Sequence, residues 1–452
     1  MNAADQAISP AVPPARIWPA RLLAAAMAAG AIAVSAGAGA ASHSAGTPAV
    51  LTAGRMAAMV ALALFMMQFA LSARVRWLDR AFGLDRLYRI HAMVGASAAV
   101  LVSAHPVLVA LAGERAENPA AAWLPAHGEL IGAVMLALAW LIVATAVWRM
   151  FLGLSYEAWR WVHRLTFILV LGVLVHAFSI GGDLQSRGWV WWLWAAALAA
   201  YAAGFGYVKL IRPLFAPRRF EVVSVRRATH DTVNVEMKPS SGRPFRYLPG
   251  QFAFIRFRST AVAPQEHPFT ISSSPTRAEA ISMTIKQSGD FTRTVGRLQP
   301  SDEARLFGPL GRFSHTLLAR EGEPLVMIAG GIGITPMLSM LRYLADTGEA
   351  RRVTLVWANR TEDDILFRDE IDRLQKRLSD FVVHHVLSRQ PGWQGSAGRI
   401  DHAMLDRLLA AEDRAGCALV CGPRGMMNAV RRHLRKCGFP RRKIHAERFA
   451  MS

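Results

Sequence analysis

The chain has 452 residues, of which 53% are hydrophobic, and a formal net charge of +20. This length exceeds what one hydrophobic core supports and predicts two or three domains. The basic residues are spread over many segments rather than gathered in one helix or tail, so the charge favours membrane lipid as a partner and argues against nucleic acid. Only three cysteines occur, Cys417, Cys421 and Cys437. Their spacing excludes a four-cysteine iron-sulfur cluster, and in the cytoplasm they predict no disulfide.

Apolar runs dominate the first 211 positions, each close to the ~20 residues that a helix needs to cross a bilayer. We predict six spans, at about Leu22 to Ala41, Leu51 to Leu71, His91 to Leu111, Leu130 to Phe151, Val162 to Ile180 and Val190 to Ile211. For the first span a second interpretation stays open. Arg16 and Arg21, followed by an alanine-rich run and SAGAGAAS, also fit a cleaved signal peptide.

Arginine-rich segments orient these spans. Arg74 to Arg89, Arg149 to Arg164 and Lys209 to Arg219 are basic, whereas the loops between them on the other side are not. Because basic loops stay on the cytoplasmic side, we expect a multi-pass protein of the cell inner membrane with both chain ends in the cytoplasm.

Four histidines lie in two of the predicted spans. His91 and His105 are about 21 Å apart along one helix axis, and His163 and His176 about 20 Å along another. Neutral imidazoles at two depths can hold two haems between the helices, although a single intramembrane histidine more often bonds a neighbouring helix. Side chains fourteen residues apart lie on nearly the same face of a helix, whereas side chains thirteen residues apart do not. To present both rings inward, the second helix must therefore use different rotamers, tilt or be distorted.

The composition changes after Pro213. Short alternating strands at Phe220 to Arg226, Thr232 to Met237, Phe252 to Phe257 and Ile281 to Lys286 predict a small antiparallel β-barrel. Beyond Glu323, strands alternate with helices, which predicts an α/β doubly wound parallel sheet with ligands at the carboxyl ends of its strands. We therefore expect three domains, at residues 1–212, 213–319 and 320–452.

A glycine-rich turn follows the first strand of this α/β region. Gly330, Gly331 and Gly333 let backbone amides approach a pyrophosphate, and the helix that opens near Thr335 and Pro336 offers its positive end to that charge. A second turn of this kind contains the cofactor-site candidates Cys421, Gly422 and Pro423. Both turns are expected at the same edge of the sheet, where a dinucleotide would bind.

Together these motifs resemble the ferric reductase and NADPH oxidase flavocytochromes, in which a six-span haem domain is joined to a ferredoxin-NADP reductase-like module. The resemblance covers about Arg74 to Ser452. It implies two b-type haems, the inner held by His91 and His163 and the outer by His105 and His176. It also implies that residues 213–319 bind FAD and residues 320–452 bind NAD(P)H.

The resemblance extends to individual residues of the flavin and nicotinamide sites. It implies flavin contacts from one strand and the residues after it, His267, Pro268, Phe269, Thr270, Ser272 and Ser273. It implies a pyrophosphate segment made by Lys286, Gly289 and Thr292. It makes Cys421 and Phe449 the catalytic candidates, and Cys421 would lie close to the transferred hydride. Phe449 would cover the flavin ring, or is an ordinary core phenylalanine, since three residues follow it.

The choice of nucleotide depends on the ends of the second and third strands. Arg360, Ser388 and Arg389 are placed to grip a 2′-phosphate, which favours NADPH. Glu362 and Asp363 follow closely enough to keep a ribose-binding site, and therefore NADH, open.

We accordingly predict an NAD(P)H-dependent oxidoreductase that passes electrons through FAD and two haems to an acceptor outside the cytoplasm. A ferric chelate is the favoured acceptor, and dioxygen reduced to superoxide is the alternative. A periplasmic protein or quinone is a third possible partner. A haem-binding membrane sensor or scaffold without enzymatic activity is the rival interpretation. The chain has no EF-hand calcium loop.

Overall fold

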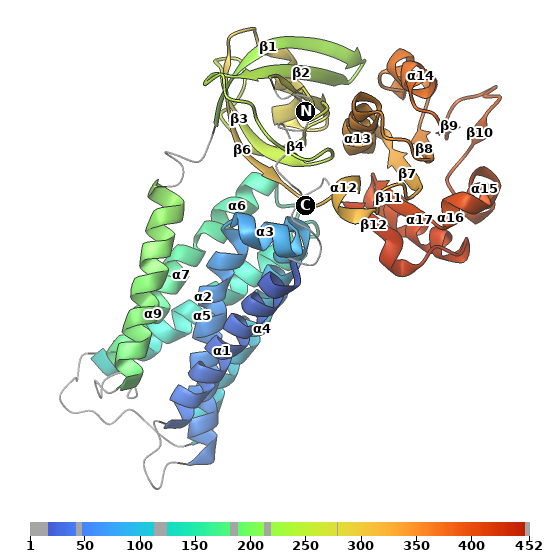
Figure 1. Ribbon diagram of the computed structural model, residues 1–452. Coiled ribbons are helices and arrows are strands. Elements are labelled where there is room, and N and C mark those ends of the chain that lie inside the picture. The colour runs from blue at the N-terminus through green and yellow to red at the C-terminus, as the bar shows by residue number, and fades with distance from the viewer. Residues whose placement is uncertain are drawn as a thin grey trace. The chain divides into compact units, whose positions relative to one another are not determined.

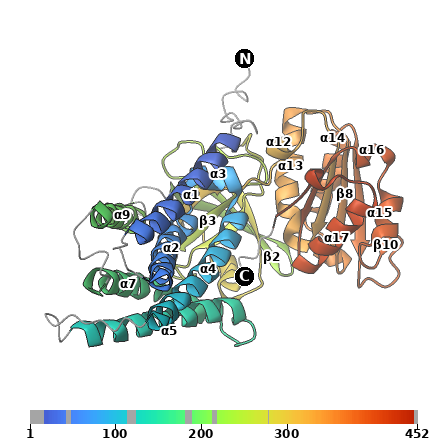
Figure 2. The ribbon, with the colours of Figure 1, turned by 90° about the horizontal axis from the view of Figure 1, so that it is seen from below.

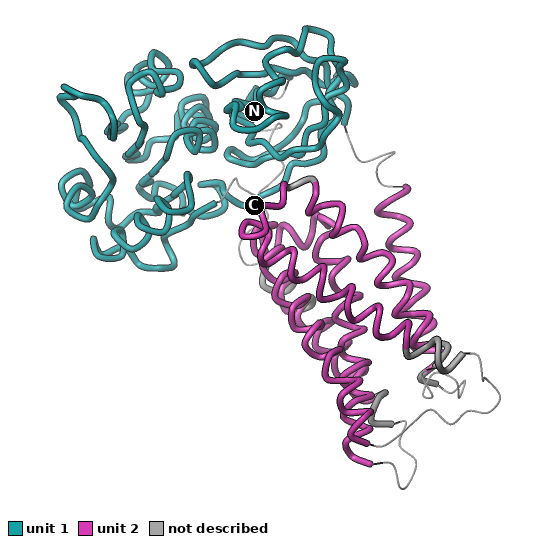
Figure 3. The backbone as a smooth tube through the Cα atoms, turned by 180° about the vertical axis from the view of Figure 1, so that it is seen from behind, with its two compact units in different colours: residues 1–17, 214–451 teal, residues 18–213, 452 magenta. Residues whose placement is uncertain are grey.

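The computed structural model describes residues 17–41, 48–112, 124–180, 189–211, 218–277 and 279–447. It divides into two compact units (Figure 3). One unit runs from Trp18 to Pro213 and is helical, and the other runs from Leu214 to Met451 and contains both sheets.

The helical unit contains several long apolar helices (Figure 1). Its helices are α1 (Ile17–Ala41), α2 (Ala49–Ser72), α3 (Arg76–Phe82), α4 (Leu84–Leu111), α5 (Leu124–Trp148), α6 (Tyr156–Arg164), α7 (Thr166–Ile180) and α9 (Trp189–Gly206), which continues as a short π-helix (Tyr207–Ile211). Five described segments are long and apolar enough to cross a membrane: Ala49–Ser72, Leu84–Leu111, Leu130–Trp148, Ala158–Ala177 and Trp191–Ile211. These correspond to the second to sixth predicted spans. In the first, the described apolar stretch is only Ala25–Gly37, so the structure does not confirm six spans.

Helix α2 packs along α4, and Figure 2 shows the two side by side. Gly54 permits the close approach, since a Cβ at this position would lie 3.1 Å from the Cβ of Leu108. Small residues at such crossings are how membrane helices gain packing contacts without a hydrophobic driving force.

The span that carries His163 and His176 is interrupted between them. Helix α6 ends at Arg164 and α7 begins at Thr166. The hydroxyl of Thr166 donates a hydrogen bond to the His163 carbonyl oxygen at 2.8 Å, which satisfies one acceptor at the break. This interruption is one of the distortions that the thirteen-residue spacing predicts.

The first sheet of the second unit is antiparallel and six-stranded, in the order β4-β3-β6-β1-β2-β5. Its strands are β1 (Arg218–Thr229), β2 (Thr232–Pro239), β3 (Phe252–Arg258), β4 (His267–Thr270), β5 (Ile281–Lys286) and β6 (Glu303–Leu310), with the short helices α11 (Asp290–Thr294) and α12 (His315–Leu318). Alternate strand residues such as Val233, Val235 and Met237 are buried in one apolar cluster. A single bridge, Ile271 to Met283, links the two edges, so the sheet approaches the predicted barrel without forming a continuous one.

The second sheet is parallel throughout, in the order β10-β9-β8-β7-β11-β12. Its strands are β7 (Leu325–Gly330), β8 (Val353–Asn359), β9 (Phe381–Leu387), β10 (Ser396–Ala397), β11 (Cys417–Cys421) and β12 (Ile444–Glu447). Its helices are α13 (Ile334–Thr347), α14 (Arg368–Arg377), α15 (His402–Leu408), α16 (Ala411–Arg414) and α17 (Arg424–Lys436). Separate apolar clusters join α13 and α14 to one set of strand side chains and α15 and α17 to the other. The predicted doubly wound sheet is therefore present.

Candidate functional site

The strand order reverses between β7 and β11, and the two glycine turns meet at this point. A Cβ at Gly333 would lie 2.4 Å from the Cys421 carbonyl oxygen, and one at Gly422 would lie 3.0 Å from the Gly330 nitrogen. Gly331 has a φ of +52°, which disfavours larger residues. The backbones of the two glycine turns therefore pack directly against each other at one edge of the sheet. This is the position where α/β sheets bind ligands.

Hydrogen bonds to two carbonyl groups fix the conformation of the turn after β7. Trp357 Nε1 donates to the Gly331 oxygen at 3.1 Å, and the Thr335 hydroxyl donates to the Ile332 oxygen at 3.1 Å. The first backbone N–H groups of α13 have no acceptor within the helix and can bind an anion. Thr335 and Pro336 are buried, so they shape this turn from inside the fold.

Cys421 ends β11 with no exposed surface. Burial, reinforced by the charge of Glu447, raises the pKa of its thiol well above the usual value. The side chain is therefore a neutral thiol at physiological pH and is unsuited to nucleophilic attack. Pro423 precedes α17 and is exposed at the same edge.

The predicted 2′-phosphate residues come together at the ends of β8 and β9. The Arg389 N–H donates to the Arg360 carbonyl oxygen at 2.8 Å, and the Ser388 hydroxyl donates to the Asn359 oxygen at 3.3 Å. Both arginines are exposed. Their guanidinium groups can thus approach one anion.

Glu362 and Asp363, the two acidic residues that could bind the ribose of NADH, differ in their surroundings. The Glu362 carboxylate pairs with Arg368, whereas Asp363 is exposed. A paired carboxylate is less available to a ribose hydroxyl, so Asp363 is the better placed of the two.

The flavin strand and the pyrophosphate segment meet through aromatic stacking. The His267 ring lies 4.1 Å from the Phe291 ring, centroid to centroid, with 29° between the planes. Phe269 lies 6.4 Å from the same Phe291 ring. His267, Pro268 and Phe269 are half-buried in β4, while Thr270 is buried. The stacking places β4 beside the start of α11, as a cofactor spanning both segments requires.

Backbone amides at the start of α11 are ordered by a threonine. The Thr292 hydroxyl accepts hydrogen bonds from the Ser288 and Gly289 amides, each at 2.9 Å, and donates to the Gly289 oxygen at 3.0 Å. Thr292 therefore sets the backbone of the predicted pyrophosphate segment.

Lys286, also predicted for this segment, pairs with Asp231 at 2.9 Å. Partial burial acts to raise the pKa of Asp231, but hydrogen bonds from Lys286 and Thr232 and the nearby positive charges outweigh it and lower that pKa. The carboxylate therefore stays charged and holds the ammonium group in place.

Ser272 and Ser273 hold the segment after β4 in place. Ser272 has no exposed surface, and its hydroxyl lies 3.0 Å from that of Thr284. The Ser273 hydroxyl lies 2.8 Å from the Tyr247 hydroxyl and accepts from the Ser282 N–H at 3.0 Å. Both hydroxyls are thus engaged within the protein, which gives these serines a supporting position. Phe449, the predicted flavin cover, lies outside the described residues.

Two of the four histidines face each other in the helical unit. The rings of His91 in α4 and His163 in α6 have centroids 5.9 Å apart, inclined by 59°. His163 Nδ1 is buried and has no hydrogen-bond partner in the described part of the chain. Two imidazoles from different helices at this separation could together hold one haem iron.

Helix α2 contacts both histidines of α4. His105 Nδ1 lies 3.0 Å from the Gly54 carbonyl oxygen, and His91 Nδ1 lies 3.2 Å from the Gln68 carbonyl oxygen. At His105, a carbonyl that accepts the Nδ1 proton leaves Nε2 as the metal-binding nitrogen, the usual arrangement of ligating histidines.

His176 has a different neighbour. A Cβ at Gly132 of α5 would lie 2.8 Å from His176 Cε1, so this glycine provides the space that the ring occupies. The structure thus places His105 against α2 and His176 against α5, and it brings His91 and His163 together. Buried imidazole nitrogens, oriented rings and apolar helices fit haem.

Gly54, Gln68 and Gly132 were not identified from the sequence as part of this site. One signal was present: Gly54 and Gln68 are separated by fourteen residues, the same spacing as His91 and His105. Two equal spacings on neighbouring helices indicate paired contacts only once the helices are known to lie side by side.

Comparisons with protein families match three parts of the chain. Residues 57–174 match the ferric reductase like transmembrane component, residues 218–312 an FAD-binding domain, and residues 327–432 the oxidoreductase NAD-binding domain. The first match includes His91, His105 and His163, and ends two residues before His176.

The relatives below match about half of this chain, and one solved structure covers most of it. The reductase component of propane 2-monooxygenase from Mycolicibacterium goodii is 30% identical over 51% of this chain and 67% of its own length. NADH-cytochrome b5 reductase 1 from Candida glabrata is 29% identical over 50% of this chain and 81% of its own length. The flavohemoglobin structure from Malassezia yamatoensis aligns with a TM-score of 0.51 at 18% identity, over 90% of this chain and 100% of that one, a likeness of fold alone.

Proposed function

Because the chain belongs to the reductases in which a ferric reductase-like transmembrane component is joined to FAD-binding and NAD-binding domains, we propose that it carries electrons from NAD(P)H across a membrane. It is an NAD(P)H-dependent oxidoreductase and a membrane protein. The proposed path leads from the cytoplasm through FAD and two b-type haems to an acceptor outside it, most simply a ferric chelate.

The proposal divides the chain into a haem domain at 1–212, an FAD domain at 213–319 and an NAD(P)H domain at 320–452. It includes a sixth span at about Leu22 to Ala41, a barrel-like flavin domain, and an inner-membrane location with the flavin and nucleotide domains cytoplasmic. The basic segments, such as Arg74 to Arg89, support this orientation.

In the haem domain, His91 and His163 would hold the inner haem and His105 and His176 the outer. The observation that carries this assignment is the 5.9 Å approach of the His91 and His163 rings from two different helices. The α2 carbonyl groups support it, because they orient rings without competing for Nε2.

In the second unit, β4 and the start of α11 would hold the flavin, and the glycine turns at Gly331 and Cys421 would hold the nicotinamide nucleotide. When bound, the nicotinamide and flavin supply hydride transfer and haem supplies one-electron transfer. The chain would orient the reactants through these two turns. Arg360 and Arg389 would bind the 2′-phosphate of NADPH, with NADH as the alternative nucleotide.

The test is anaerobic mixing of the purified protein with NADPH, and separately with NADH, while the Soret band is recorded. Reduction of haem on mixing supports the proposal, and a haem-binding scaffold would stay oxidised. Ferric citrate is then added to one sample and dioxygen to another. Preferential reoxidation by ferric citrate supports a chelate as acceptor, and preferential superoxide formation replaces it with dioxygen.

A further inference from the structure

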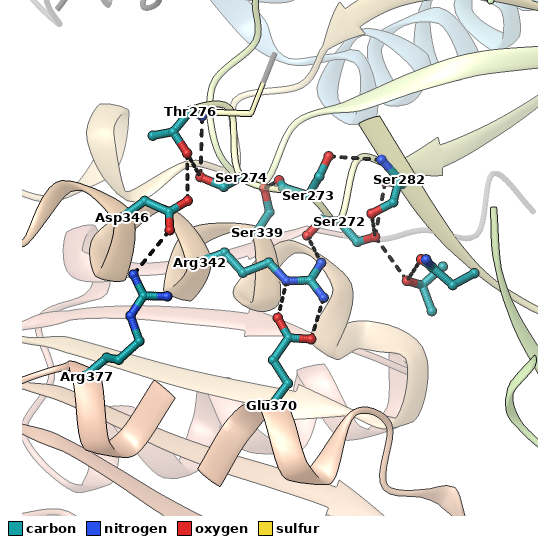
Figure 4. A network of polar contacts seen from close by, with 12 residues as sticks. Ser272, Ser273, Ser274, Thr276, Ser282, Ser339, Arg342, Asp346, Glu370 and Arg377 are labelled. Carbon is teal, nitrogen blue, oxygen red and sulfur yellow. Dashed lines mark hydrogen bonds and ion pairs between the residues drawn. The ribbon is translucent and has the colours of Figure 1, made fainter. Parts of the chain in front are cut away.

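Helix α13 is bonded to the segment that follows the flavin strand β4 (Figure 4). The Ser339 hydroxyl donates to the Ser273 carbonyl oxygen at 2.7 Å, and Arg342 Nη1 donates to the Ser272 carbonyl oxygen at 2.6 Å. One turn further on, the Asp346 carboxylate accepts from the Thr276 hydroxyl at 2.6 Å. Ser339, Arg342 and Asp346 are spaced by three and four residues and therefore lie on one face of α13. This face contacts residues 272–276.

Arg342 is the centre of these contacts. Its Nε and Nη2 donate to the two carboxylate oxygens of Glu370 in α14, each at 2.7 Å. The third contact, from Nη1 to Ser272, uses the remaining edge of the planar guanidinium group. The side chain is 18% exposed and that of Glu370 is 27% exposed, so the pair is partly shielded from water. Only a planar, fork-shaped cation can make all three bonds at once.

These contacts join the two segments that are predicted to bind the nicotinamide nucleotide and the flavin. Helix α13 begins directly after the Gly331–Gly333 turn, and Ser272 lies two residues after Thr270, the last residue of β4. From Ile334 to Arg342 the helix spans about 12 Å as a rigid rod. A shift of Arg342 relative to Ser272 is therefore transmitted to the nicotinamide turn.

We propose that Arg342, oriented by Glu370, is a positioning residue that sets the gap between the nicotinamide-binding turn and the flavin-binding strand. This inference rests on the proposed function. Hydride transfer needs reacting atoms about 3–3.5 Å apart, and a displacement of about 1 Å can cost on the order of a hundredfold in rate. An arginine that bonds the backbone after β4 can thus control the rate by positioning that segment.

The chain supplies a matched control in Arg352. This arginine also bonds two carboxylates, with Nε 2.9 Å from Asp413 and Nη1 3.2 Å from Asp380. All three residues belong to the nucleotide-binding sheet region, and none of these bonds reaches the segment after β4. Replacing it tests the general effect of losing an arginine–carboxylate pair.

The experiment compares Arg342→Lys, Ser339→Ala and Arg352→Lys with the wild-type full-length protein in stopped-flow reduction by NADPH. We expect Arg342→Lys to lower the limiting rate of flavin reduction by about 10- to 100-fold, with the apparent nucleotide affinity nearly unchanged. Ser339→Ala should lower it less. Arg352→Lys should leave this rate unaltered.

A second measurement does not depend on turnover. Hydrogen exchange without nucleotide should be faster at residues 272–276 in Arg342→Lys than in the wild type or in Arg352→Lys. The proposal is overturned if Arg342→Lys reduces its flavin at the wild-type rate, or if both lysine variants slow equally. Failure of NADPH to reduce the wild-type flavin would instead refute the proposed function.

Discussion

The imidazole Nδ1 of His105 lies 3.0 Å from the backbone carbonyl oxygen of Gly54 on the neighbouring helix. A carbonyl can only accept, so this contact puts the proton on Nδ1 and leaves Nε2 unprotonated. The same glycine lets the two helices approach, since a Cβ there would lie 3.1 Å from Leu108. One residue without a side chain thus provides both the contact and the space for it.

Gly54→Val should therefore weaken the outer haem site. The added methyl groups push α2 away from α4 and lengthen the bond to His105, so we expect loss of one of the two haems. Haem content per polypeptide, measured as the pyridine complex, checks this outcome. Gly206→Val is the control, because a Cβ at Gly206 meets no atom within 4 Å. Equal haem content in both variants would contradict the role of Gly54.

His105→Ala and His176→Ala should each remove the outer haem spectrum and stop electron transfer to the external acceptor. The reason is that each variant removes one of the two imidazoles that would hold this haem. Flavin reduction by NADPH should persist in both, because the second unit is unchanged. The measurement pairs Soret spectra with ferric citrate reduction, and a full haem complement with normal reduction would refute the assignment.

Arg360→Ala combined with Arg389→Ala should discriminate between the nucleotides. Charge-assisted hydrogen bonds contribute about 1.5–3 kcal/mol, which corresponds to roughly a 10- to 100-fold rise in KM for NADPH. KM for NADH should stay constant, as NADH lacks the 2′-phosphate. Arg373→Ala combined with Lys376→Ala, at two exposed basic residues of α14, controls for the loss of two positive charges. A similar rise for both nucleotides would show that these arginines do not read the 2′-phosphate.

His315 should make the second unit sensitive to acid. The side chain is 1% exposed, and burial, aided by the charge of Arg351, lowers its pKa from 6.5 to about 3. As pH falls below 6.5 the unfolded chain binds a proton that the native state excludes, so stability is lost between these two values at up to about 1.4 kcal/mol per pH unit. Glu349, 3.9 Å from Nε2, is too weakly placed to reverse this.

In His315→Leu, the unfolded chain no longer takes up a proton at this position as the pH falls. We expect its Tm to fall less than the wild-type Tm when the pH is lowered from above 6.5 towards 3. Thermal unfolding followed by tryptophan fluorescence measures the difference. Parallel curves for the two proteins would show that His315 does not carry the effect.

Much of the fold follows from local patterns. Apolar run length identified the five spans that the structure describes, because the bilayer thickness sets the length of a crossing helix. Periodicity and turn residues identified the parallel sheet and its glycine turns. The barrel was less predictable, because closure depends on how far the edge strands extend. Among the residues that the structure describes, the edges are linked by the isolated bridge between Ile271 and Met283.

The sequence by itself determined the membrane half, the two-sheet reductase half, the four histidines and the two glycine turns, since each depends on residue type and short spacing. Only the tertiary structure decided that His91 meets His163, that Gly54 orients His105, and that Arg342 joins Glu370 to Ser272. These contacts join residues far apart in the chain. Their partners are backbone carbonyls or ordinary charged side chains, which carry no local signature until packing brings them within hydrogen-bond distance.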